Sequence, residues 1–179
     1  MQENFKTWIT FAWKPDNDGQ PDHTEDMDPG GETNFGVTFA TWQHFARRGY
    51  VTGSLASASQ NALMLVLRLD CWHPCQCDIL PSGIDILIAD MAMVAGPGAA
   101  AKCLQRTVGV ADDGDIGPLT LAAIKGQGND LLLLIQDLLR ADDEYYAALR
   151  QFRLWGRGWE RRAADCAKLS KALVGPAFP

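Results

Sequence analysis

The chain has 179 residues, of which 47% are hydrophobic and 21% are charged. This length and composition fit one compact folded unit, and they exclude a short peptide, a low-complexity chain and two large independent domains. The net charge of −6 arises entirely within residues 1–33, which hold eight acids and two bases. Such an acidic segment argues against nucleic acid as the main partner, because phosphate binding needs a basic surface.

Helical periodicity and turn residues predict short helices along the chain. The expected helices cover residues 5–14, 39–48, 57–70, 84–96, 97–108, 119–124, 130–152 and 158–173. Pro15 ends the first helix, since the residue before a proline avoids the helical region. The apolar helix over 84–96 is expected to be largely buried, and Pro97 is suited to begin the helix that follows it.

Loops and turns separate these helices. Residues 15–33 are rich in Pro, Gly, Asp and Asn, and they predict a long acidic loop of the kind that often carries function. Residues 34–38 favour a short strand or turn, and Thr38 can cap the next helix. Further loops are expected over 71–83 and 111–118. The chain is therefore predicted to be mainly α, with one small β-hairpin near 34–38.

The cysteines and the start of the chain bear on the compartment. An odd number of cysteines and no basic segment followed by an apolar one predict reduced thiols and synthesis in the cytoplasm without a signal peptide. No apolar run is long enough to span a membrane. The spacing of Cys71, Cys75 and Cys77, with His73 between them, does not match common zinc patterns, so no metal and no cofactor is expected.

The segment Asp28-Pro-Gly-Gly-Glu-Thr-Asn-Phe-Gly-Val-Thr38 is the strongest chemical cluster. Two adjacent glycines permit backbone shapes that other residues resist, and they hold an acid, Asp28, near a hydroxyl, Thr33. Hydrolysis of a glycosidic bond needs an acid that protonates the leaving oxygen and a second polar group that steadies the cation or positions water. The residues alone also fit a plain turn, so both interpretations stay open at this point.

This segment resembles the signature of the N-acetylmuramidase family, glycoside hydrolase family 108. Three further stretches resemble that family in the same order: residues 71–105, with their tryptophan, closely spaced cysteines and Leu-Pro-x-Gly; residues 108–124, similar to its peptidoglycan-binding segment; and residues 155–162, similar to its closing motif. The resemblance covers nearly the whole chain.

The resemblance implies a lysozyme-like helical domain with a small β-hairpin over residues 1–87, fused to a helical peptidoglycan-binding lobe over residues 88–179. The two parts are expected to pack as one compact unit. The implied activity is hydrolysis of the bond between N-acetylmuramic acid and N-acetylglucosamine, and the implied partner is the glycan strand of peptidoglycan.

The family's catalytic glutamate opens a Glu-Gly-Gly motif, which this chain lacks. Asp16 lies nearest to that position, close to the expected end of the first helix, and it is the preferred proton donor. Asp18, Glu25 and Glu32 are alternative acids. A further alternative is that the acid is absent and activity is lost, because a misplacement of about 1 Å can cost on the order of a hundredfold in rate.

The resemblance assigns two more catalytic residues by position. Asp28 would stabilise positive charge or orient water, and Thr33 would hold that water. Expected contacts with the substrate come from Glu32, Asn34, Phe35 and Trp72. Turn formation is the alternative role for Asp28 and Thr33, and core packing is the alternative for the aromatic rings.

Two other functions remain open at this point. A catalytically impaired protein would bind peptidoglycan without cutting it, and a lytic transglycosylase would cut the same bond without water. The family also implies an endolysin-like monomer of phage or prophage origin, which a holin or an export system releases so that it acts in the periplasm or cell wall.

Overall fold

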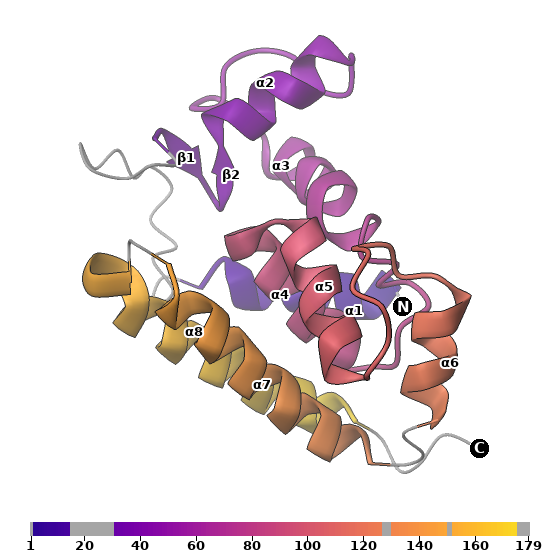
Figure 1. Cartoon of the computed structure of the whole chain (residues 1–179). Helices are drawn as coiled ribbons and strands as arrows, with labels where there is room; N and C mark the ends of the chain where they lie inside the picture. The colour runs from indigo at the N-terminus through magenta and orange to yellow at the C-terminus, as the bar shows by residue number, and fades with distance from the viewer. Residues whose placement is uncertain (1, 15–30, 127–129, 150–151, 175–179) are drawn as a thin grey trace.

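The computed structural model describes residues 2–14, 31–126, 130–149 and 152–174. It is mainly helical with one small antiparallel hairpin, as the sequence predicted (Figure 1). The helices are α1 (Gln2–Ala12), α2 (Phe39–Arg47), α3 (Gln60–Leu67), α4 (Ile84–Ala95), α5 (Pro97–Thr107), α6 (Pro118–Gly126), α7 (Leu131–Ala147) and α8 (Phe152–Leu173). The strands are β1 (Thr33–Asn34) and β2 (Val37–Thr38), and a π-helical turn, η2 (Arg68–Trp72), follows α3.

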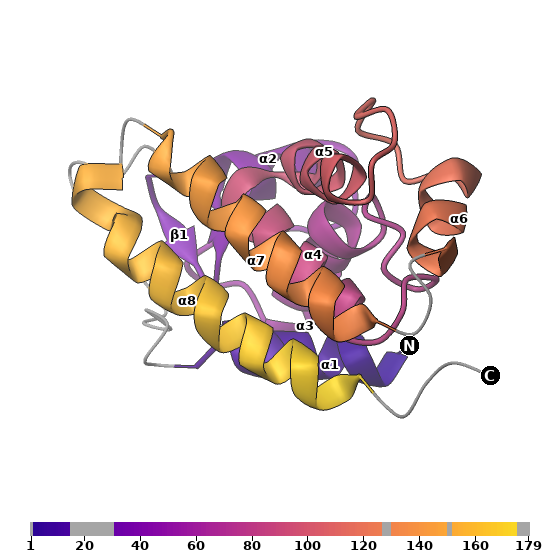
Figure 2. The same ribbon diagram turned by 60° about the horizontal axis from the view of Figure 1, so that its bottom comes forward.

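Helix α4 lies at the centre of the fold. All of its residues from Ile84 to Ala92 are buried, which confirms the prediction of a buried apolar helix. It packs against α1, η2, α5, α7 and α8. The long helices α7 and α8 lie side by side and cover α4, while the hairpin and α2 project from the other end of the molecule (Figures 1 and 2). Helix α4 therefore lies within the hydrophobic core that the surrounding helices share.

Side-chain caps decide where two of the helices begin. The hydroxyl of Thr38 accepts a hydrogen bond from the Thr41 amide at 3.2 Å, so α2 starts at Phe39 as predicted. The hydroxyl of Ser59 does the same for the Ala62 amide at 3.3 Å, so α3 begins at Gln60 and not at residue 57. The capping residue Ser59 therefore sets the start of α3.

Helix α8 begins earlier than the sequence indicated. The predicted start was residue 158, but the helix starts at Phe152 and runs through Gly156 and Gly158. A glycine inside a helix costs about 1 kcal/mol relative to alanine. Packing along α7, which is the partner of α8 over most of its length, outweighs that cost.

The predicted boundary at residues 87/88 lies inside α4, which contacts α1 on one side and α5 and α8 on the other. Both proposed parts of the chain thus share this helix, and the division itself stays a prediction. Within the part of the chain that the structure describes, no helix is long and apolar enough to cross a membrane.

Candidate active site

The β-hairpin is built on two residues with left-handed backbone. Its strands pair Thr33 with Thr38 and Asn34 with Val37, and Phe35 (φ 47°) and Gly36 (φ 82°) form the turn between them. A left-handed backbone is costly for a residue with a side chain, so the conformation of Phe35 indicates that its surroundings hold it there. The amide of Phe39 donates to the carbonyl of Glu32 at 2.8 Å and fixes the base of the hairpin.

The turn rests on α4. A Cβ atom at Gly36 would overlap Cε of Met93, near the carboxyl end of that helix. The backbone angle favours glycine at this position, and an added Cβ would also force the flexible end of Met93 to move. This contact connects the hairpin, which carries the predicted site residues, to the central helix of the fold.

Asn34 and Thr33 form different contacts within the hairpin. Asn34 is buried, and its Nδ2 donates to the carbonyl of Leu55 at 2.9 Å, which attaches the hairpin to the chain before α3. Thr33 is half-buried, and its hydroxyl donates to the carbonyl of Gly31 at 3.0 Å. A hydroxyl that donates in this way keeps its oxygen lone pairs available to accept a hydrogen bond from water.

The end of α1 forms the opposite side of the site. Trp13 follows α1 directly, and its indole nitrogen donates to the carbonyl of Phe35 at 3.1 Å. Asp16 and Asp28 lie outside the described residues, as do the alternative acids Asp18 and Glu25. The structure therefore describes the two ends of the chain that flank residues 15–30, namely the end of α1 and the start of the hairpin.

Trp72 is not at this site. The structure places it in the core, where its ring has 0% exposure, packs against Phe5 and Trp8, and donates its indole hydrogen to Asp78 at 3.0 Å. A side chain without exposed surface offers nothing to a sugar ring, so the expectation of a direct substrate contact is corrected. Of the expected substrate contacts, Glu32 and Phe35 are half-buried and remain open to the surface.

A family model is similar to the part of the chain that contains the hairpin. Residues 19–96 match the sequence model of the family Glycosyl hydrolase 108. Over these residues the chain is similar to the glycosyl hydrolase 108 family. The match begins after Asp16 and ends directly after α4, so it contains the hairpin but not α1. It thus excludes the region in which the Glu-Gly-Gly motif is missing.

A solved structure is similar to almost the entire chain. The match is to the structure of Brucella abortus SagA, whose sequence is 28% identical to this chain. The aligned part covers 97% of each chain, and the TM-score is 0.87. No curated protein matches the chain. The lysozyme-like, mainly helical fold is confirmed, and the protein is a glycoside hydrolase of the muramidase type that acts on peptidoglycan.

A buried ion pair joins α4 and α8. The guanidinium of Arg162 on α8 donates to both carboxylate oxygens of Asp90 on α4, at 2.7 and 3.0 Å. The indole of Trp8 on α1 donates to the same carboxylate at 3.1 Å, and Arg162 also reaches the sulfur of Met93 at 3.6 Å. The sequence prediction placed Arg162 in the helix over 158–173 and Asp90 in the apolar helix over 84–96. That buried helix contains two acids, Asp85 and Asp90, and a buried charge needs a partner, so these acids were the available signal.

A further buried acid, Asp142, lies on α7. The pKa of Asp142 is raised to about 7, mainly by burial; a hydrogen bond from Tyr146 opposes the rise, and the nearby carboxylates of Asp90 and Asp143 add to it. Asp142 is only 4% exposed, and its Oδ1 has no hydrogen-bond partner within the described structure. A carboxyl group with this pKa could supply a proton near neutral pH, but its burial keeps it away from any glycan.

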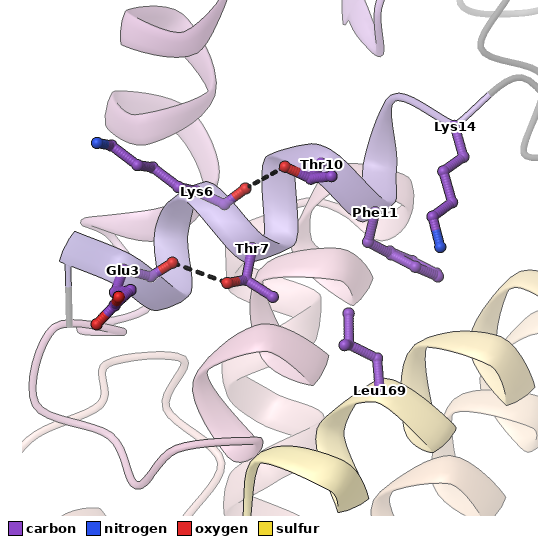
Figure 3. Close-up of a pocket in the computed structure, with 7 residues that line it drawn as sticks. All are labelled: Glu3, Lys6, Thr7, Thr10, Phe11, Lys14 and Leu169. Carbon is purple, nitrogen blue, oxygen red and sulfur yellow. Dashed lines mark hydrogen bonds between the residues drawn. The ribbon is translucent and has the colours of Figure 1, made fainter.

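Two surface cavities lie elsewhere on the molecule. Figure 3 shows the first, of about 310 Å³, on the outer side of α1 next to Leu169 of α8. Its hydroxyls, from Thr7 and Thr10, donate to the carbonyls of Glu3 and Lys6. The second, of about 770 Å³, lies between α5 and α7. Neither cavity is lined by a hairpin residue, so we base the site on the hairpin and the family match.

Proposed function

We propose that this peptidoglycan hydrolase cleaves the glycosidic bond between N-acetylmuramic acid and N-acetylglucosamine by general acid catalysis. The observation that carries the proposal is the fixed hairpin, with Thr33 at its base, directly opposite the end of α1. The segment that joins these two sides contains both proposed carboxylates, Asp16 and Asp28. Such a pair supplies the two functions that glycoside hydrolysis requires.

The proposed roles follow from position and chemistry. Asp16 lies just beyond α1 and would protonate the glycosidic oxygen as the bond to the anomeric carbon breaks. Asp28 would stabilise the positive charge that develops on the sugar or orient the attacking water. Thr33 would accept a hydrogen bond from that water, since its own proton is donated to Gly31. Glu32 and Phe35 would contact the glycan, and Asn34 would support the hairpin from behind.

Binding by the part of the chain after residue 88 is a further element of the proposal. The acidic turn over 111–118 is held from below by the buried Gln105. Its Nε2 donates to Asp113 at 2.6 Å and to the carbonyl of Asp115 at 2.9 Å, and its Oε1 accepts from the Gly114 amide at 2.8 Å. A turn fixed in this way presents a constant surface, which supports attachment to the cell wall through this region.

Binding without cleavage is the second candidate function. It is favoured by the missing Glu-Gly-Gly motif and by Trp13, which occupies the described part of the α1 side that faces the hairpin. This candidate predicts that the protein sediments with purified cell-wall sacculi and releases no soluble fragments.

A digest of purified peptidoglycan tests the proposal. Hydrolysis should give reducing ends at muramic acid, whereas a lytic transglycosylase would give products one water lighter, which mass spectrometry resolves. Asp16→Asn and Asp28→Asn should each lower the rate by at least about tenfold, as expected for loss of an acid or a charge-stabilising group. Asp137→Asn, on the exposed side of α7, is the control. Full activity of Asp16→Asn would refute the assignment of the proton donor.

The proposed biological setting is endolysin-like cell-wall lysis. The protein would be made in the cytoplasm as a monomer and reach the periplasm through a holin or an export system. Expression with and without a co-expressed holin, followed by culture turbidity, tests this route. Lysis of cells that lack the holin would contradict release through a holin.

A further inference from the structure

Trp13 joins α1 to the hairpin turn through two contacts. Its indole N–H donates to the backbone carbonyl of Phe35 at 3.1 Å, and the two rings lie 4.9 Å apart at a tilt of 51°. The amide of Trp13 donates to the carbonyl of Ile9 at 3.0 Å, so its backbone is held by α1. The hairpin turn is thereby attached to the helix by a directional bond and by ring packing.

The contact joins two residues that flank the proposed catalytic segment of the chain. Trp13 precedes Asp16 by three residues, and Phe35 follows Thr33 by two. The contact therefore closes the segment that carries both proposed carboxylates, and it sets the separation of the two ends of that segment. Closing a chain segment restricts the conformations open to the residues within it.

The turn also needs a partner on this side. Phe35 has a left-handed backbone (φ 47°), which a residue with a side chain adopts only where its surroundings stabilise it. Met93 contacts the turn from α4, next to Gly36. The indole of Trp13 contacts it from α1, so the turn is held between two helices.

We infer that Trp13 is a positioning residue for the proposed hydrolysis. It fixes the end of α1, after which the chain continues to Asp16, against the hairpin that carries Thr33. The inference rests on the proposed function, and it assigns Trp13 no contact with the sugar. Because a displacement of about 1 Å can cost on the order of a hundredfold in rate, a change at Trp13 should act mainly on the chemical step.

The chain contains a matched control for this tryptophan. The indole of Trp42 on α2 also donates to a backbone carbonyl, that of Gly53, at 3.0 Å. Trp42 lies in the core with 2% exposure, and its bond joins α2 to the chain before α3 and not α1 to the hairpin turn. Trp13→Phe and Trp42→Phe each keep an aromatic ring and remove one indole donor, so both variants lose the same kind of bond.

Kinetics and hydrogen exchange together test the inference. Trp13→Phe should lower kcat by about tenfold or more with KM changed less than about twofold, whereas Trp42→Phe should keep the wild-type kcat after correction for the folded fraction. The hairpin amides should exchange faster in Trp13→Phe and at the wild-type rate in Trp42→Phe. Equal kcat values, or unchanged exchange in Trp13→Phe, would overturn the inference.

The two proposals fail in different ways. A wild-type chain that releases no fragments from peptidoglycan contradicts the proposed hydrolysis. Amide exchange needs no activity, so it decides in every case whether Trp13 holds the hairpin. An active wild type with an equally active Trp13→Phe variant leaves the hydrolysis intact and removes the positioning role alone.

Discussion

The hairpin and the α4–α8 contact are held by different kinds of interaction. The hairpin depends on backbone geometry, namely the left-handed turn at Phe35 and Gly36 and single hydrogen bonds from Asn34 and Trp13. The α4–α8 contact depends on a buried charge pair, Asp90 with Arg162. The difference teaches that substitutions in the hairpin should change the rate of the reaction, whereas substitutions in the charge pair should change the stability of the whole molecule.

Removing Arg162 should produce the largest loss of stability. Arg162→Met leaves the Asp90 carboxylate buried without its cation, and breaking a buried pair in this way costs about 3–5 kcal/mol. Urea unfolding measures the change. Arg140→Met is the matched control, because Arg140 pairs with Asp137 on the surface at 2.9 Å and exposed pairs contribute about 0–1 kcal/mol. Similar losses in the two variants would contradict the comparison.

Asp142 should make stability depend on pH. The pKa of its carboxyl is raised from 3.8 to about 7, first of all by burial. The folded protein therefore binds this proton more tightly than the unfolded chain. The stabilisation is fully present below the unfolded pKa, and it is lost as pH rises through about 7.

The variant Asp142→Asn tests this dependence, since it keeps the shape of the side chain and removes the ionisation. It should be more stable than wild type above pH 7, by an amount on the order of a few kcal/mol. Unfolding measured from pH 4 to pH 9 gives the slope for each protein, with Asp137→Asn as the control on the same helix. A slope identical to that of wild type in Asp142→Asn would count against the assignment.

Gly36→Ala should have a smaller effect on stability and a clear effect on rate. Alanine there must adopt a left-handed backbone, at a cost of about 1–2 kcal/mol, and its Cβ would displace Met93. Gly49, at the end of α2, has a similar φ of 78° but no atom within 4 Å of an added Cβ. Gly49→Ala therefore controls for the backbone term. Equal kcat in the two variants would show that the hairpin tip does not affect catalysis.

Local patterns predicted the hairpin and most helices correctly, because their causes are local. The Asn-Phe-Gly turn, the threonine cap before α2 and the apolar run of α4 are each contained within a few residues. The start of α8 was predicted at residue 158, but the helix begins at Phe152 and includes two glycines whose cost is compensated by packing against α7. The candidate acids were chosen by position alone, and Asp16 and Asp28 stay predictions.

The sequence by itself indicated the family resemblance, the helical class and the hairpin that carries Thr33, since these depend on ordered motifs and near neighbours in the chain. Only the tertiary structure decided that Trp72 belongs to the core, that Arg162 pairs with Asp90 and that Trp13 holds Phe35. Each of those facts joins residues from different elements. Burial and hydrogen bonding depend on which elements meet in space, and spacing along the chain does not specify that.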